Sequence, residues 1–400
     1  MAMQDFQSFS FQGHRALVRV DFNVPLDDSL HITDDTRMRA AVPTIQKIRH
    51  DGGAVVLMSH LGRPKKGPED KYSLRHLVKH LSELLNTEVL FAEDCVGETA
   101  LSKAQALQPG QVLLLENLRF HPEEEKGDAA FARQLAQLGD VYVNDAFGTA
   151  HRAHASTAVI AQFFPPDRKM FGLLMEAEVK NAERVLHHAE KPFVAVLGGA
   201  KVSDKIGIIT NLLPRVSALI IGGGMAYTFL KAQGHEIGKS LCETDKLDLA
   251  KDILQQAHQQ GVEIALPVDS VVAPRLDAEA PTQIVDHAHF PADQMGLDIG
   301  PETIKRYSTL IQRARTILWN GPMGVFELKP FVKGTQAIAE AIVQATQAGA
   351  FSLVGGGDSV AALHQFGLED RVSYVSTGGG ALLEYFEGKT LPGIAAIQES

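Results

Sequence analysis

Residues 193–201 read FVAVLGGAK, an apolar run that ends in two glycines, an alanine and a lysine. The pattern returns at 218–224 (ALIIGGG), 351–359 (FSLVGGGDS) and 372–380 (VSYVSTGGG). Short apolar runs of this kind are typical of buried parallel strands, and helix-like sequence follows each glycine cluster. Ligands of open parallel sheets bind at the carboxyl ends of the strands, where glycines expose backbone N–H groups at helix N-termini. Four such junctions together predict a site for a polyphosphate.

The first half of the chain also alternates strands and helices, but its strands end in polar and charged residues. Apolar runs at 16–20, 54–58, 112–115 and 141–143 lead into DFNVP, SHLGRP, ENLRF and NDAFG. This alternation predicts an α/β fold, with a doubly wound parallel sheet in each half. Arginine offers forked donors that suit phosphate and carboxylate, and arginines stand at or just beyond three of these strand ends. A single arginine is more often a surface charge, and convergence depends on a sheet order that the sequence does not show.

Composition limits the functional class. A chain of 400 residues favours two domains, and a net charge of −10 argues against nucleic acid or an acidic membrane as a general partner. Cys95 and Cys242 lie far apart without a CxxC motif, which indicates neither a disulfide framework nor a zinc site and fits the cytoplasm. We also see no signal-peptide pattern and no apolar run near the roughly 18 residues of a membrane span.

The domain boundary is expected near residues 163–168, FFPPDR. Residues 173–190 then read as one amphipathic helix, which is either a rigid connector between domains or a helix packed on the second sheet. We therefore expect a first domain over residues 1–170 and a second over 171–387.

Two glycine junctions carry charged side chains. In 198–205 (GGAKVSDK), Lys201 and Lys205 are four residues apart, so on a helix both would reach an anion at the glycine turn. The alternative is a solvated first turn. After Gly355, Asp358 suits a Mg²⁺ ion that keeps several waters, and the alternative is that Asp358 or Ser359 caps the helix.

Two further segments complete the survey. Residues 316–327, TILWNGPMGVFE, form a fifth apolar run with a polar end, and Glu327 is a candidate for a ribose hydroxyl. The alternative is a Gly-Pro turn beside a buried tryptophan. Residues 234–240, GHEIGKS, resemble a P-loop but have one residue too few between the glycines and follow a helical run, so we reject them as a phosphate cradle.

These motifs, taken in order, resemble the phosphoglycerate kinase family. The resemblance rests on RVDFNVP (19–25), SHLGRP (59–64), DAFGTAHR (145–152), GGAKVSDK (198–205), WNGPMGVFE (319–327), GGGD (355–358) and STGGG (376–380), and it extends from about Phe6 to the last residues. It implies reversible phosphoryl transfer between 1,3-bisphosphoglycerate and ADP, giving 3-phosphoglycerate and ATP in glycolysis, with Mg²⁺ at Asp358. It further implies a monomer that closes by hinge bending, and a C-terminal tail, about 388–400, that packs back on the first domain.

The resemblance also implies roles for individual residues. The first domain would bind the glycerate through Asp21, Phe22, Asn23, Arg37, His60, Leu61, Gly62, Arg63, Arg119 and Arg152. The second would bind the nucleotide through Lys201, Gly222, Gly223, Leu297, Asn320, Glu327, Gly356, Gly357, Asp358 and Ser359. Catalysis would fall to Arg37, Lys201, Lys205, Gly357 and Gly380.

Two other functions remain open at this point. One is an NAD-dependent dehydrogenase with two α/β domains, which the lack of a GxGxxG motif and the many arginines disfavour. The other is a non-catalytic anion-binding protein. Such a protein would not need Lys201, Lys205 and Asp358 at corresponding helix starts, which disfavours this function.

Overall fold

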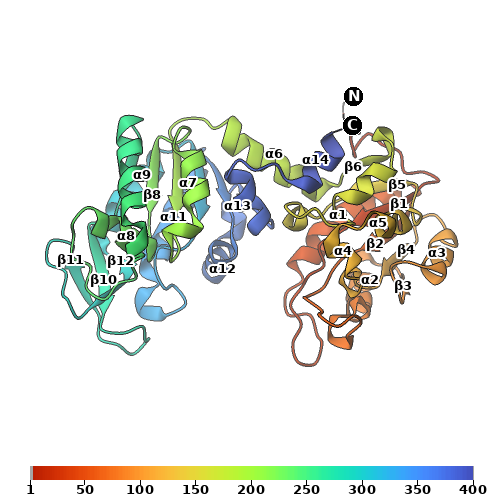
Figure 1. Cartoon of the computed structure of the whole chain (residues 1–400), viewed down its shortest axis with the longest axis horizontal. Coiled ribbons are helices and arrows are strands. Elements are labelled where there is room, and N and C mark those ends of the chain that lie inside the picture. Colours follow the sequence, from red (N-terminus) through yellow and green to blue (C-terminus); the bar gives the residue numbers. More distant parts are fainter. Residues whose placement is uncertain (1–2, 400) are drawn as a thin grey trace. The chain divides into compact units, whose positions relative to one another are not determined.

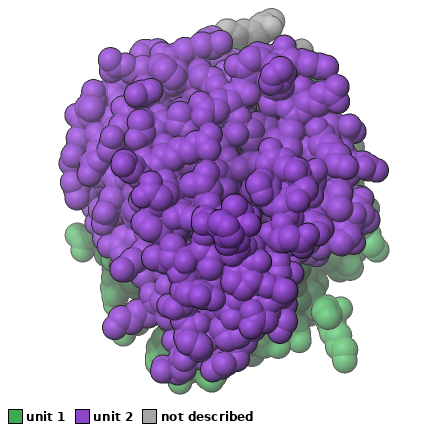
Figure 2. Space-filling view, turned by 90° about the vertical axis from the view of Figure 1, so that its left-hand side faces the viewer, with its two compact units in different colours: residues 1–179, 390–400 green, residues 180–389 purple. Residues whose placement is uncertain are grey.

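The computed structural model describes residues 3–399, which form two compact units (Figure 2). Among the described residues, unit 1 consists of residues 3–179 and 390–399, and unit 2 consists of residues 180–389. Each unit is built around its own six-stranded parallel sheet, so the predicted α/β class is confirmed. Within residues 3–399, none of the helices combines the length and apolar character needed to cross a membrane.

In unit 1, the four polar strand ends identified in the sequence belong to neighbouring strands. Its sheet has the order β3-β4-β2-β1-β5-β6. The strands are β1 (Arg15–Arg19), β2 (Ala54–Met58), β3 (Val89–Ala92), β4 (Val112–Leu115), β5 (Val141–Asn144) and β6 (Lys169–Phe171). The four polar ends identified in the sequence follow β4, β2, β1 and β5, which are consecutive in the sheet. Because these strands are parallel, their carboxyl ends lie along one edge.

Helices cover the sheet of unit 1 with their apolar faces (Figure 1). These helices are α1 (Thr36–His50), α2 (Val78–Leu85), α3 (Glu98–Gln105), α4 (Glu123–Lys126), α5 (Ala129–Ala136) and the C-terminal α14 (Pro392–Gln398). Helix α1 shows the pattern: Met38, Ala41, Ile45 and Ile48 recur at helical spacing and are buried in the core. The Nζ atom of Lys169 in β6 donates to the Ala396 carbonyl of α14 at 3.0 Å, which anchors the end of the chain within unit 1.

Unit 2 repeats the arrangement with glycine-rich strand ends. Its main sheet has the order β15-β14-β13-β7-β8-β9. The strands are β7 (Phe193–Leu197), β8 (Ala218–Ile221), β9 (Glu263–Ala265), β13 (Thr316–Asn320), β14 (Phe351–Val354) and β15 (Tyr374–Val375). The five strands that precede glycines in the sequence are therefore consecutive.

Unit 2 also contains a three-stranded antiparallel sheet, β11-β10-β12, that the sequence analysis missed. It consists of β10 (Asp269–Ala273), β11 (Gln283–Asp286) and β12 (Met295–Ile299). The helices of unit 2 are α7 (Ile206–Leu212), α8 (Met225–Ala232), α9 (Leu247–Gln259), α10 (Pro301–Arg313), α11 (Lys333–Gln347), α12 (Gly357–Phe366) and α13 (Gly380–Phe386).

The helix expected over 173–190 is α6 (Leu173–His187), and the boundary between the units falls inside it. Its first turn is held by Asp145, which follows β5. The Oδ1 atom of Asp145 accepts hydrogen bonds from the backbone N–H groups of Leu174 and Met175 at 2.9 and 3.1 Å. A buried carboxylate therefore caps the helix that links the two units.

Asp145 is expected to make stability depend on pH. Burial is the main cause that raises its pKa from 3.8 to about 7, so the folded chain binds the proton more tightly than the unfolded chain. The stabilisation of the folded chain by protonated Asp145 is therefore full below pH 3.8 and is lost as the pH rises through about 7. Asp145→Asn mimics the protonated form, so its free energy of unfolding should fall less between pH 5 and pH 8 than that of the wild type, by on the order of 2–3 kcal/mol.

Urea unfolding at both pH values measures this difference. Asp140→Asn is the matched control, because Asp140 is half-exposed and pairs with His14 at the surface of the same unit. Equal pH dependence in the wild type and Asp145→Asn would show that this carboxyl does not titrate in the folded state as expected.

Candidate active site

In unit 1, the ends of β1 and β2 and the start of α1 are joined by Asn23. Its side-chain Oδ1 accepts the Gly62 N–H at 2.8 Å, and its carbonyl accepts Nη1 of Arg37 at 2.8 Å. The same Nη1 lies 3.6 Å from Oδ1 of Asp21. Gly62 has φ +62° and the Tyr72 ring against its Cα, so a side chain there would clash. Asp21, Asn23, Arg37 and Gly62 thus form one connected group.

Phe22 and Leu61, which were also predicted to contact substrate, have side chains in the hydrophobic core. The N–H of Phe22 donates to Oγ of Ser59 at 2.9 Å. Both side chains therefore support the loops around them.

Arg119 lies beside this group with an unused donor. Its Nη1 donates to the Gly62 carbonyl at 3.0 Å, and its Nε is buried without a hydrogen-bond partner among residues 3–399. The nearest carboxylate, on Glu125, is 3.8 Å from Nε. A buried unpaired donor is costly, so an anionic oxygen is the natural partner for it.

His60 shows that several cations converge here. Burial, and then the charges of Arg19, Arg119 and Arg37, hold the pKa of His60 well below 6.5. The neighbouring His154 is affected in the same way, because burial and the charges of Arg119, Arg19 and Arg152 lower its pKa to about 4. Both imidazoles are therefore neutral near pH 7, where they donate hydrogen bonds without adding charge. Arg63 and Arg152 are exposed near the cluster.

A buried network that the sequence analysis missed supports His60. Arg19, at the end of β1, is fully buried, and its Nη2 lies 3.2 Å from Nδ1 of His60. Its Nε donates to Oγ of Ser156 at 2.8 Å, and that hydroxyl donates to Glu124 at 2.5 Å. Because arginine is always charged, Nδ1 of His60 accepts and Nε2 carries the proton. The available signal was an arginine inside an apolar strand, which needs a buried partner.

Open hollows adjoin the group in unit 1. One of about 370 Å³ is lined by Asn23, Val24, Pro25, Asp34 and Arg37. A second of about 360 Å³ includes Asn23, Leu61 and Gly62 in its wall. Volumes of this size suit a small molecule.

In unit 2, Asn320 joins the ends of three strands. Its carbonyl accepts the Gly198 N–H at 2.9 Å, and its Nδ2 donates to the Gly355 carbonyl at 2.8 Å. Its Oδ1 accepts Nζ of Lys205. Asn320 is buried, and its side chain holds the Gly355 loop and Lys205 in place.

The two lysines do not share a helix face, which corrects the sequence-based expectation. Lys201 is extended and precedes a short 3₁₀ turn, Val202–Asp204, and α7 begins only at Ile206. Lys201 is exposed, whereas Lys205 is largely buried. Burial lowers the pKa of Lys205, and the nearby charges of Asp204 and Asp358 oppose that shift. A regular helix does not start at residue 201, because the backbone of Lys201 is extended, with φ −127° and ψ 133°.

Asp358 and Ser359 begin α12, but neither caps it. The N-cap is Gly356, with φ +95° and without a side-chain capping hydrogen bond. Asp358 is exposed in the first turn. Ser359 is buried, and its Oγ accepts the Gly321 N–H at 2.7 Å, which ties α12 to the loop after β13. The carboxylate of Asp358 is therefore available to a ligand beside the amides of Gly356 and Gly357.

The remaining candidates of unit 2 differ in exposure. Gly222 and Gly223 follow β8, and the Gly223 N–H donates to the Met323 carbonyl at 3.1 Å. Leu297, in β12, packs in a small core with Phe331 and retains slight exposure. Glu327 and Gly380 are exposed, and Gly380 begins α13. Hydrogen bonds bring the loops after β7, β8, β13 and β14 together, and Leu297 is tied to them because its carbonyl accepts the Val325 N–H of the loop after β13 at 2.9 Å.

Comparisons with known proteins give one answer. The sequence profile of the family described as phosphoglycerate kinase matches residues 5–389. A phosphoglycerate kinase of Porphyromonas gingivalis is 58% identical, with 98% of this chain and 99% of the relative covered, and one of Chloroflexus aurantiacus is 54% identical with both chains fully covered. The solved phosphoglycerate kinase of Coxiella burnetii has a TM-score of 0.91 at 42% identity, covering 99% of this chain and 98% of its own.

The solved enzyme of Pyrococcus horikoshii agrees, with a TM-score of 0.84 at 34% identity over 99% of this chain and 98% of its own. Identity above 50% over whole chains, together with the same two-sheet architecture, excludes a match confined to one domain. The chain therefore belongs to the phosphoglycerate kinase family.

Proposed function

We propose that the chain transfers a phosphoryl group reversibly between 1,3-bisphosphoglycerate and ADP, giving 3-phosphoglycerate and ATP. The observation that carries this proposal is that the strand ends of the two sheets carry different types of residue. Unit 1 gathers arginines and histidines at its strand ends, whereas unit 2 gathers glycines, two lysines and a carboxylate. The first set suits a small phosphorylated acid, and the second suits a nucleotide polyphosphate.

The glycerate is assigned to unit 1. Asp21 and Asn23 would bind its hydroxyl and carboxyl end, and Arg37 would meet the reacting carboxyl. Its phosphate would take the unused Nε of Arg119 and the Nε2–H of His60, together with Arg63 and Arg152. The neutral state of His60 supports this arrangement, because a neutral donor avoids repulsion within a cluster of arginines.

The nucleotide is assigned to unit 2. Its phosphates would lie against Lys201, Lys205 and the amides of Gly356 and Gly357, and its base near Gly222, Gly223 and Leu297. Glu327 would accept hydrogen bonds from the ribose. Gly380, at the start of α13, would direct further backbone N–H groups toward the transferring group.

Asp358 is the residue that would hold Mg²⁺. One exposed carboxylate beside a phosphate site matches the chemistry of this ion, which takes few protein ligands and keeps waters and phosphate oxygens. When bound, Mg²⁺ neutralises charge on the nucleotide phosphates.

The reaction needs positioning and charge stabilisation more than proton transfer. The acceptor carboxylate of 3-phosphoglycerate is already ionised at neutral pH, so the site needs no general base. Negative charge spreads over the transferring group, and Lys201, Arg37 and the helix N-termini are positioned to meet it within their own units.

The two substrates are assigned to different units, so transfer requires the units to close, with α6 as the connection. Closure would also exclude the water that hydrolyses an acyl phosphate. We propose that a single chain is the working unit, as membership of the family implies, and that it works in the cytoplasm.

A coupled assay with 3-phosphoglycerate and MgATP tests the function. Turnover that requires both substrates is expected, with ADP and an acyl phosphate as products. A folded chain without turnover would contradict the proposal and favour an anion-binding protein, whereas hydride transfer to a nicotinamide would favour a dehydrogenase.

A further inference from the structure

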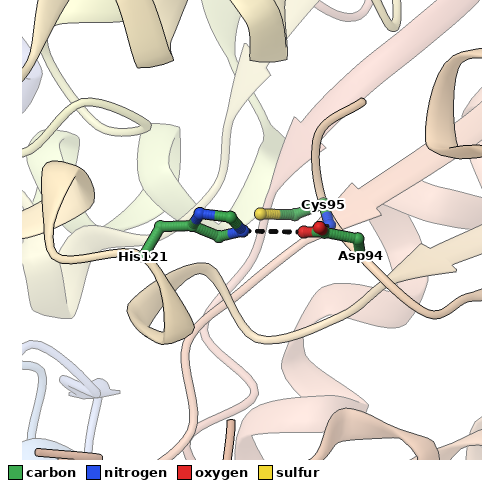
Figure 3. A group of neighbouring side chains, drawn as sticks. All are labelled: Asp94, Cys95 and His121. Atoms are coloured by element: carbon green, nitrogen blue, oxygen red, sulfur yellow. Dashed lines mark hydrogen bonds and ion pairs between the residues drawn. The ribbon is translucent and has the colours of Figure 1, made fainter. Parts of the chain in front are cut away.

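A group of three potential metal ligands lies in unit 1 and takes no part in the proposed reaction. Asp94 and Cys95 follow the edge strand β3, and His121 follows the 3₁₀ turn Leu118–Phe120 after β4. One ligand atom from each residue lies within 4.8 Å of the other two (Figure 3). Among residues 3–399, this is the only group of three histidines, cysteines or carboxylates that meets this distance.

Local contacts hold the three side chains in place. Nε2 of His121 lies 2.7 Å from Oδ1 of Asp94, and the same oxygen accepts the Cys95 N–H at 2.7 Å. The ring of His121 packs against Phe131 with the centroids 5.2 Å apart. Figure 3 shows the thiol next to the contact between the His121 imidazole and the Asp94 carboxylate.

Burial differs among the three in a way that suits an entering ion. The Cys95 side chain is fully buried, whereas 50% of the Asp94 side chain and 30% of the His121 side chain are exposed. The thiol therefore lies below two polar groups that reach solvent. An ion can therefore enter from the side on which Asp94 and His121 reach solvent.

The donor set indicates the class of ion. Sulfur, imidazole nitrogen and a single carboxylate oxygen favour Zn²⁺ and similar transition metals, whereas Mg²⁺ and Ca²⁺ prefer oxygen alone. Bonds of about 2.0–2.3 Å in a tetrahedron place ligand atoms roughly 3.3–3.8 Å apart. Oδ1 of Asp94 and Nε2 of His121, now 2.7 Å apart, must therefore separate slightly, and ligand atoms near the 4.8 Å limit must approach by about 1 Å. We propose that Asp94, Cys95 and His121 bind a divalent transition-metal ion of the zinc type, with water completing the tetrahedron.

The simpler interpretation is a surface ion pair beside an inert thiol. Burial raises the pKa of the Cys95 thiol well above its ordinary value, so without a metal the sulfur keeps its proton, and binding must release it. The chain supplies one control for the ion pair and one for the thiol. His289 and Asp286 form a comparable pair, at 2.9 Å, and Cys242 is the second free thiol.

Titration with Co²⁺ tests the site directly, because cobalt replaces zinc and a thiolate ligand gives a charge-transfer absorption band. The experiment uses the full chain without a histidine tag, reduced, free of nucleotide and in excess Mg²⁺. We expect one Co²⁺ per chain with this band, and competition by Zn²⁺. Cys95→Ser should abolish the band, and Asp94→Asn and His121→Gln should each weaken Co²⁺ binding by about tenfold or more.

Cys242→Ser and His289→Gln should bind Co²⁺ as the wild type does. Because Cys95 is buried, circular dichroism must show that Cys95→Ser is folded; if it is not, Asp94→Asn and His121→Gln decide, since their side chains are partly exposed. Absence of the band in the wild type, or unchanged affinity in Asp94→Asn and His121→Gln, would overturn the proposal.

Discussion

Replacing Lys201 by alanine is expected to lower kcat by about 100- to 1000-fold, the loss typical when one group that stabilises transition-state charge is removed. Lys201 ends the loop after β7 in an extended conformation, and its side chain is exposed at the edge where the glycine loops meet. In the proposed reaction its ammonium acts on the charge of the transferring phosphoryl group, so the KM for 3-phosphoglycerate should change little. Steady-state kinetics in the ATP-consuming direction measure both constants.

Two matched variants separate this role from general electrostatics. Lys239 is an exposed lysine of the same unit, in the segment that only resembles a P-loop, so Lys239→Ala should leave kcat unchanged. Lys201→Arg keeps the charge but alters its position, and it should recover part of the activity. If Lys201→Ala turns over at the wild-type rate, the assigned role is wrong.

Strand positions and strand-end chemistry could be predicted from the sequence because both are local. The run 193–197 is β7 residue for residue, and the run 218–221 is β8. Sheet order is not local, and it decides whether the polar ends meet. Only the structure shows that β4, β2, β1 and β5 are neighbours, and only then do Arg119, His60 and Arg37 become one electrostatic cluster.

The failures share a physical cause. Lys201 and Lys205 have helical spacing, but spacing does not show that Lys201 is extended and that α7 begins only at Ile206. The hydrogen bond from Arg19 to Ser156 joins segments more than 100 residues apart, which no pattern in a single sequence records. The group of Asp94, Cys95 and His121 could not be predicted from the sequence either. Cys95 has no CxxC partner, and its spatial neighbour His121 follows a different strand, β4.

Replacing Arg119 by alanine is expected to raise the KM for 3-phosphoglycerate by about 10- to 100-fold with a small change in kcat. The reason is the buried Nε, which has no hydrogen-bond partner among residues 3–399 and sits on a side chain that is only 13% exposed. Hydrogen bonds to a charged group contribute about 1.5–3 kcal/mol, which corresponds to this range. Because the non-reacting phosphate carries the same charge before and after transfer, this contact should act on binding and not on the chemical step.

Substrate kinetics and competition by sulfate together test whether Arg119 binds phosphate. Arg119→Lys keeps a positive charge but loses the forked donors, so its KM should lie between those of the wild type and Arg119→Ala. Arg75→Ala removes an exposed arginine that pairs with Asp70 in the same unit, and it should leave KM unchanged.

Sulfate should inhibit the wild type competitively with 3-phosphoglycerate and inhibit Arg119→Ala more weakly. Loss of the Nη1 contact with the Gly62 carbonyl could also disturb the loop, but that effect would not depend on sulfate. A wild-type KM together with full sulfate inhibition in Arg119→Ala would therefore place the substrate phosphate elsewhere.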